Sequence, residues 1–171
     1  MSSKTYYLQP DKKFVKQGYQ MFDENKEVVY EAKVIKQTFF AATPYEFINH
    51  ITQKTENHKI GHTVTTEQSG GMFSMMTTKS YFKFDGKKIW DYLHEIGIRI
   101  DSHPSGKKLG MIYNITLKGK EMATIETTAG NGSKSIITNG VCYEVKTDDE
   151  NIDLAFLIAF AFAKTDQIFY S

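Results

Sequence analysis

The residues best suited to bind a metal are His58 and His62, which lie four positions apart. On a helix this spacing would place both imidazoles on one face, where they can chelate a zinc ion. Gly61 and the threonines that follow instead favour a strand, in which four residues span about 13 Å. Two histidines so far apart cannot share one ion directly. We therefore predict surface histidines, no metal site and no cofactor, and we interpret the remaining histidines in the same way: His50, His94 and His103.

Three other patterns suggest chemistry but lack a required part. Residues 130–135 resemble a phosphate-binding loop, yet they precede a strand-like run instead of a helix, so a hairpin turn is favoured. The acidic residues 148–150 lack the alternating ligands of a calcium loop. Cys142 has no activating histidine pattern beside it. Because no nucleophile elbow is present either, an enzyme is less expected than a binding protein.

Lysines and aromatic residues gather between residues 79 and 88. Such a surface could meet anionic lipid, with about 1 kcal/mol gained per lysine near the membrane. The simpler interpretation is a solvated strand face. The candidate lipid-binding or anion-binding residues are Lys79, Lys83, Lys87, Lys88, Lys107 and Lys108.

Composition and charge narrow the class of protein. The 171 residues fit one domain spanning residues 1–171. The formal net charge of +1 lacks the positive excess of a nucleic-acid-binding protein, and Arg99 is the only arginine. Cys142 is the only cysteine, and the first residues contain no signal-peptide core. We therefore expect no nucleic-acid partner and a cytoplasmic location, peripheral at the membrane if the lysines bind lipid.

Hydrophobic periodicity predicts the elements that position these residues. Residues 154–163 are apolar without a break, and a helix that is apolar all round must be surrounded. Because a membrane span needs roughly 20 apolar residues, we predict a buried helix near residues 150–170. Alternation with period two predicts strands in most of the chain before it. These strands include residues 28–35, 45–51, 111–117 and 141–146.

The boundaries of two helices also carry sequence signals. Residues 147–150 have the spacing of a capping box and would begin the C-terminal helix. A second, short helix is predicted by apolar residues at helical spacing from Ile89 to Ile96, including Trp90, with Asp85 as a cap and Gly97 as the stop. Many strands and one helix without a polar face together predict a closed or nearly closed antiparallel sheet around that helix.

The chain resembles the tubby C-terminal-like superfamily, which includes the LURP-one-related proteins and the phospholipid scramblases. The resemblance rests on the tyrosine-rich residues 6–9, on residues 19–24 followed by residues 28–30, and on residues 143–145 leading through residues 153–159 into the terminal helix. It implies a mainly β (α+β) fold, an antiparallel β-barrel of about twelve strands wrapped around a central hydrophobic C-terminal α-helix. It carries over no site residue.

The function suggested by this resemblance concerns membranes. Tubby proteins bind phosphatidylinositol bisphosphate through basic residues, and scramblases act at membranes. We therefore expect a non-enzymatic tubby-like binding module for a lipid headgroup, a membrane surface or a protein partner. The alternatives are a small-molecule-binding or catalytic β-barrel with an open mouth, a protein-protein interaction scaffold, and a protein anchored in lipid by its C-terminal helix.

Overall fold

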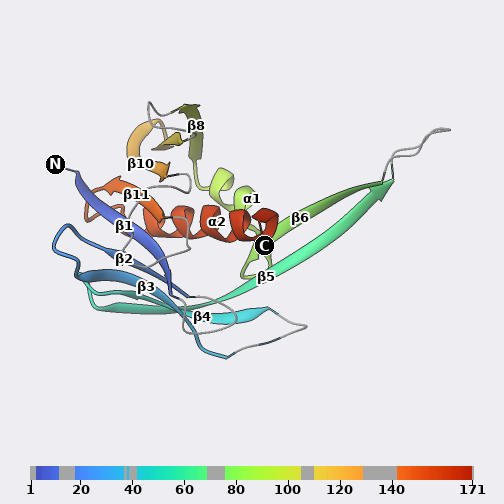
Figure 1. The fold of residues 1–171 in the computed structure, drawn as a ribbon, viewed down its shortest axis with the longest axis horizontal. Coiled ribbons are helices and arrows are strands. Elements are labelled where there is room, and N and C mark those ends of the chain that lie inside the picture. Colours follow the sequence, from blue (N-terminus) through green and yellow to red (C-terminus); the bar gives the residue numbers. More distant parts are fainter. Residues whose placement is uncertain are drawn as a thin grey trace.

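A computed structural model (Figure 1) describes residues 3–11, 18–36, 38, 42–68, 76–104, 110–128 and 142–170. Within them the chain forms a mainly β fold with two helices, as the sequence predicts. The strands of the first half are β1 (Lys4–Asp11), β2 (Gly18–Phe22), β3 (Val28–Val34), β4 (Thr43–Asn49), β5 (Lys54–Gln68), β6 (Met76–Phe84) and β7 (Lys87–Lys88). The remaining elements are α1 (Ile89–Glu95), β8 (Ile98–Pro104), β9 (Met111–Leu117), β10 (Lys120–Thr128), β11 (Cys142–Thr147) and α2 (Ile152–Tyr170).

The strands of the described residues form one antiparallel sheet in the order β7-β6-β5-β4-β3-β2-β1-β11-β10-β9-β8. The first and last strands of the chain, β1 and β11, pair in the middle of the sheet. The sheet has eleven strands, where about twelve were expected, and its end strands β7 and β8 do not pair with each other among the described residues. The helix α1 links β7 to β8 in the chain and contacts both.

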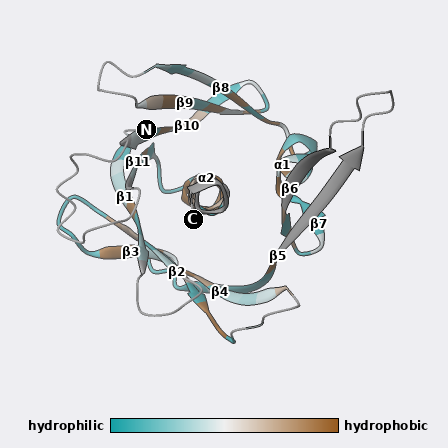
Figure 2. Ribbon diagram, turned by 45° about the vertical axis from the view of Figure 1, so that its right-hand side comes forward, coloured by the Kyte–Doolittle hydropathy of each residue, from teal (hydrophilic) through white to brown (hydrophobic). Residues whose placement is uncertain are grey.

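Strand alternation decides which side chains face α2. Along β4, Tyr45 and Phe47 are buried while Glu46 and Ile48 are only partly covered. Figure 2 shows the sheet curving around α2, which lies on its concave side. Seven consecutive helix residues, 155–161, are at most 7% exposed. The predicted apolar helix is therefore buried against the sheet.

Aromatic rings from several strands pack against α2. The ring of Phe160 lies 5.3 Å from that of Tyr19 on β2, 5.2 Å from that of Phe47 on β4 and 5.8 Å from that of Phe82 on β6. Tyr30 of β3 stacks on Phe156 at 4.2 Å. One helix face thus contacts strands that are distant in the sheet. Within the described residues, neither helix combines the length and the hydropathy that crossing a bilayer would require.

The predicted caps of both helices are wrong. The hydroxyl of Thr147 donates to the carbonyl of Met122 on the neighbouring strand, so it does not cap α2. The carboxylate of Asp148 instead accepts from the backbone N–H of Asn151, one residue before the helix begins.

Asp85 does not cap α1, whose N-cap position is Lys88. Gly97 does end α1 as predicted, because its φ of +97° lies in the left-handed region that glycine tolerates.

Truncation of Phe160 tests the packing between α2 and the sheet. We expect Phe160→Ala to lower the free energy of unfolding by about 3–5 kcal/mol, because it removes a buried ring and leaves a cavity. Leu154→Ala on the same helix should cost less than about 2 kcal/mol, because Leu154 is only partly buried. Urea unfolding followed by circular dichroism measures both. Equal decreases in the free energy of unfolding for the two variants would contradict a helix held mainly through the face that carries Phe160.

Candidate functional site

The structure divides the predicted lysines into three groups. Lys83 lies on β6, and Lys87 and Lys88 form β7. Lys79 is also on β6, but its side chain lies outside the description. Lys107 and Lys108 lie outside the described residues altogether. The structure therefore bears on three of the six candidates.

Lys83 and Lys88 lie side by side on the outward face of the sheet. They are directly opposite each other in the β6-β7 pair, while Phe82 and Phe84 on either side of Lys83 are buried. On its other side Lys83 is opposite Gly61 of β5. Lys59, two residues from Gly61, is exposed and shares this outward face. We call Lys59, Lys83 and Lys88 the lysine patch; sequence analysis missed Lys59 because only the register of β5 against β6 brings it beside the other two.

The carboxylates near the lysine patch are already engaged. Glu95 of α1 pairs with Lys87 at 3.0 Å, which removes Lys87 from the set of available cations. Glu56 and Asp85 both bind His58. Within the described residues, neither Lys59 nor Lys83 forms an ion pair. Two of the three ammonium groups of the patch, those of Lys59 and Lys83, are thus not neutralised by an ion pair within the described residues.

His58 stabilises the β6-β7 turn, which connects the strands that carry Lys83 and Lys88. Its Nδ1 lies 2.8 Å from Oδ2 of Asp85 and its Nε2 lies 3.2 Å from Oε2 of Glu56. A neutral imidazole has one N–H, so only the imidazolium can donate to both carboxylates. The ring packs against both Phe47 and Phe84, whose centroids are 5.1 Å and 4.5 Å away. The predicted surface histidine is therefore a largely covered one, with a side chain 18% exposed.

Asp85 holds the β6-β7 turn in two ways. Its Oδ1 accepts the backbone N–H of Lys59 at 2.7 Å, while its other oxygen binds His58. Its φ of +50° places it in the left-handed region, which aspartate tolerates better than most residues. The position of the hairpin that carries Lys83 and Lys88 therefore depends on this carboxylate.

Among the described residues no group of histidine, cysteine and carboxylate side chains is arranged to hold a metal ion.

Trp90 lies on α1, two residues after Lys88. It was counted among the apolar residues whose spacing predicts this helix, and the structure buries Ile89 and Leu93 but leaves Trp90 38% exposed. The indole is tilted against the ring of Phe162 of α2, with centroids 5.2 Å apart, and Phe162 stacks on Tyr113 of β9. An exposed, well-supported tryptophan thus follows the lysine patch closely in the chain.

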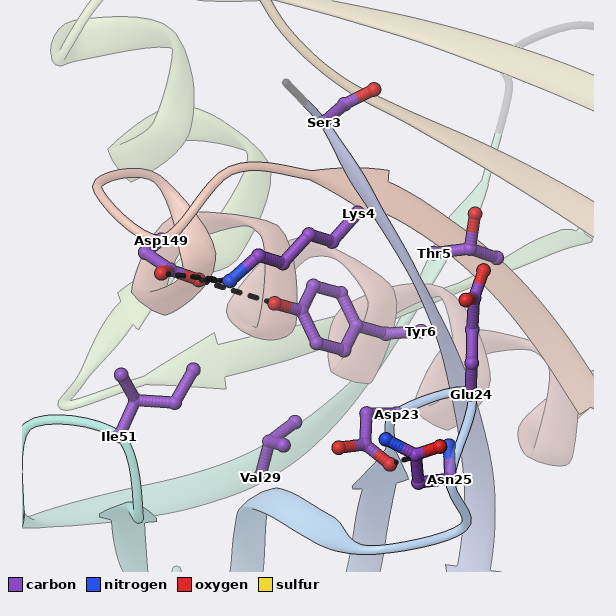
Figure 3. Close-up of a pocket in the computed structure, with 10 residues that line it drawn as sticks. All are labelled: Ser3, Lys4, Thr5, Tyr6, Asp23, Glu24, Asn25, Val29, Ile51 and Asp149. Carbon is purple, nitrogen blue, oxygen red and sulfur yellow. Dashed lines mark hydrogen bonds and ion pairs between the residues drawn. The ribbon is translucent and has the colours of Figure 1, made fainter. Parts of the chain in front are cut away.

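A pocket of about 460 Å³ lies at another part of the surface (Figure 3). It is lined by residues 3–6 of the N-terminal strand, by the turn after β2, by Val29 and Ile51, and by Asp149 before α2. Asp149 accepts hydrogen bonds from the ammonium of Lys4 at 3.1 Å and from the hydroxyl of Tyr6 at 3.2 Å. Sequence analysis could not find this pocket, since its parts are up to about 145 positions apart and match no motif.

The electrostatics of this pocket favour cations over anions. Three carboxylates line it, those of Asp23, Glu24 and Asp149, against the single ammonium of Lys4. Burial, followed by the charge of Asp149 and its hydrogen bond, raises the pKa of Tyr6 to about 12. The charges of Asp23 and Asp148 contribute the smallest parts of this rise in the pKa. The pocket and the lysine patch therefore differ in the sign of the ligand that they would attract.

Comparison with known proteins adds no relative: no family model and no curated protein matches the chain. The site therefore has to be judged from its own geometry.

The raised pKa of Tyr6 predicts a loss of stability at high pH. Below pH 10 the phenol is protonated in both the folded and the unfolded chain, so its contribution is complete. Above pH 10 the unfolded chain ionises first, and the contribution falls as the pH rises towards about 12. The difference in unfolding free energy between the wild type and Tyr6→Phe should therefore shrink over this range. A difference that stays constant from pH 9 to 12 would contradict the assignment.

Substitution of Asp85 tests how the β6-β7 turn is stabilised. We expect Asp85→Ala to cost about 1–3 kcal/mol, because it removes the hydrogen bonds that the carboxylate forms with the backbone N–H of Lys59 and with the ring of His58. Asp85→Asn should cost less, since asparagine keeps an acceptor and tolerates the positive φ. Glu121→Ala, at an exposed glutamate of β10, serves as the control. If Asp85→Ala and Glu121→Ala unfold at the same urea concentration, the carboxylate does not hold the turn.

Proposed function

We propose that this protein is a non-enzymatic, tubby-like binding module whose lysine patch contacts anionic lipid headgroups at a membrane surface. In this proposal the curved sheet is a barrel closed through α1, with α2 as its central helix. Closure is supported by the position of α1, which contacts β6 and β7 at one end of the sheet and β8 at the other. The burial of residues 155–161 supports a central position for α2.

The observation that carries the proposal is the gathering of three lysines on one outward face, of which Lys59 and Lys83 form no ion pair within the described residues. Lys83 and Lys88 are cross-strand neighbours, and Lys59 lies diagonally from Lys83, a separation of about 7–8 Å between Cα atoms. Like charges this close destabilise a sheet slightly, so the arrangement has a cost in the absence of an anion. A membrane surface rich in anionic headgroups would remove that cost and add attraction.

Trp90 gives a second reason to prefer a membrane over a dissolved anion. The residue is 38% exposed, and its indole packs against Phe162. Tryptophan favours the interface between headgroups and acyl chains, where its ring is both apolar and able to donate a hydrogen bond. Lysines together with an interfacial aromatic residue are the combination that peripheral membrane proteins use.

The acidic pocket supports a second candidate function, binding of a small cationic molecule. Its carboxylates would attract an ammonium group, and the side chains of Val29 and Ile51 would contact an apolar body. This candidate corresponds to the small-molecule alternative, in which polar groups converge at an open end of the fold. We place it second, because Asp149 is already satisfied by Lys4 and Tyr6.

Co-sedimentation with liposomes tests the lipid proposal. The protein should bind vesicles that contain phosphatidylserine or phosphoinositide, bind neutral vesicles weakly, and dissociate at high salt. Each of Lys59→Gln, Lys83→Gln and Lys88→Gln should lower the partition coefficient about fivefold, the equivalent of about 1 kcal/mol per lysine. Trp90→Ala should weaken binding in a manner that salt does not change.

Lys120→Gln provides the matched control, because it removes the same charge from an exposed residue in the other half of the sheet. Lys87→Gln should also have a smaller effect than Lys83→Gln, since Lys87 is paired with Glu95. Absence of binding to every vesicle would overturn the proposal. Equal losses for Lys120→Gln and Lys83→Gln would show that net charge acts and that the lysine patch does not.

A further inference from the structure

The strand β8 forms one end of the sheet and has a partner on one side only, β9, among the described residues. It is a full-length strand of seven residues, whereas the opposite end strand, β7, has two. Its residues from Asp101 to Pro104 are exposed. A long, exposed edge strand carries unpaired backbone groups and can template another strand.

One hydrogen bond shows which backbone groups of β8 point away from β9. The N–H of Lys118 donates to the carbonyl of Gly97, next to the pair formed by Ile98 and Leu117. In an antiparallel ladder this bond makes Ile98 a non-hydrogen-bonded position with respect to β9. Because such positions alternate, the N–H and C=O groups of Ile98, Ile100 and Ser102 face the open edge.

The side chain of Arg99 supports this assignment. Its Nη1 donates to the carbonyl of Ile98 at 3.2 Å and contacts Nδ1 of His94 at 2.8 Å. A guanidinium can reach the carbonyl of Ile98 because that group is directed away from β9. Arg99 therefore occupies a place that the N–H of a further strand would take.

The charges of β8 select one register for pairing with itself. Two antiparallel copies centred on Ile100 place Arg99 opposite the partner's Asp101 and Asp101 opposite the partner's Arg99. Centring on Asp101 would oppose two aspartates, which is unfavourable. Centring on Ser102 would oppose Ile100 to Pro104, which has no N–H to donate.

We propose that a second copy of this chain pairs with β8 through a two-fold symmetric, antiparallel register centred on Ile100. The two Ile100 residues would exchange both backbone hydrogen bonds, and Ser102 would donate to the carbonyl of Ile98 in the other copy. Arg99 would leave that carbonyl and turn towards the opposing Asp101. The Arg99–Asp101 pairs would lie at non-hydrogen-bonded positions of the new ladder, where cross-strand side chains approach most closely.

Charge reversal provides a sharp test, with sedimentation velocity of the full chain over a range of concentrations as the measurement. The wild type should form dimers, and Arg99→Glu and Asp101→Lys should each weaken association about tenfold or more, because each turns two attractive pairs into repulsive ones. An equimolar mixture of the two variants should recover the association of the wild type. In that mixture both pairs have opposite charges again.

Two controls separate this contact from general effects of charge and folding. Lys54→Glu changes the net charge as Arg99→Glu does, at an exposed residue of β5, and should leave association unchanged. Circular dichroism of each variant checks that it is folded. A wild type that stays monomeric at every concentration would overturn the proposal, and so would dimers that respond equally to Lys54→Glu or a mixture that fails to recover. Capture of a different protein along β8 without self-association would also overturn it.

Discussion

Burial of a helix without a polar face is the constraint on which the rest of this structure depends. Phe156, Ile158 and Phe160 are fully buried, and each contributes roughly 1.5–3 kcal/mol relative to exposure. Their surroundings must be apolar on all sides, which a flat sheet cannot provide. The sheet therefore curves around α2 (Figure 2), and tyrosine and phenylalanine rings from β2, β3, β4 and β6 fill the space between them.

Polar groups near each end of the buried segment limit how the helix can sit. Asp153, in its first turn, accepts hydrogen bonds from the hydroxyl of Tyr30 at 2.8 Å and from the amide of Asn49 at 3.1 Å. Burial and this carboxylate together raise the pKa of Tyr30. Further along α2, the ammonium of Lys164 lies over the rings of Tyr19 and Tyr45, at 5.5 Å and 5.2 Å from their centroids. These contacts oppose any shift of α2 along its axis.

Occupation of the concave side by α2 directs recognition to the outside of the sheet. The same strand alternation that buries Phe82 and Phe84 projects Lys83 outwards, so the core and the lysine patch are consequences of one pattern. The acidic pocket lies where the turn after β2 meets the loop before α2. The lysine patch and the edge of β8 lie at opposite ends of the strand order, but α1 contacts both β7 and β8 and brings these ends near each other.

The sequence predicted the elements well and the contacts between distant elements poorly. Period-two alternation identified β3 and β9, and the unbroken apolar run identified α2, because burial on one face or on all faces leaves a local pattern. Lys59, the partners of His58 and the pocket around Tyr6 were missed, because strand register and loop packing bring them together without a local signal. Thr147 was misread as a cap because it is the last residue of β11, where its hydroxyl donates to the carbonyl of Met122 on β10.

Native-state hydrogen exchange, resolved to individual amides, tests most directly whether α2 organises the fold. If it does, the amides of residues 155–161 should exchange only through global unfolding, at the same free energy as the most protected amides of β2, β4 and β11. Exchange of α2 at a lower free energy, with these strands still protected, would contradict the account. It would show that the sheet keeps its curvature without the helix.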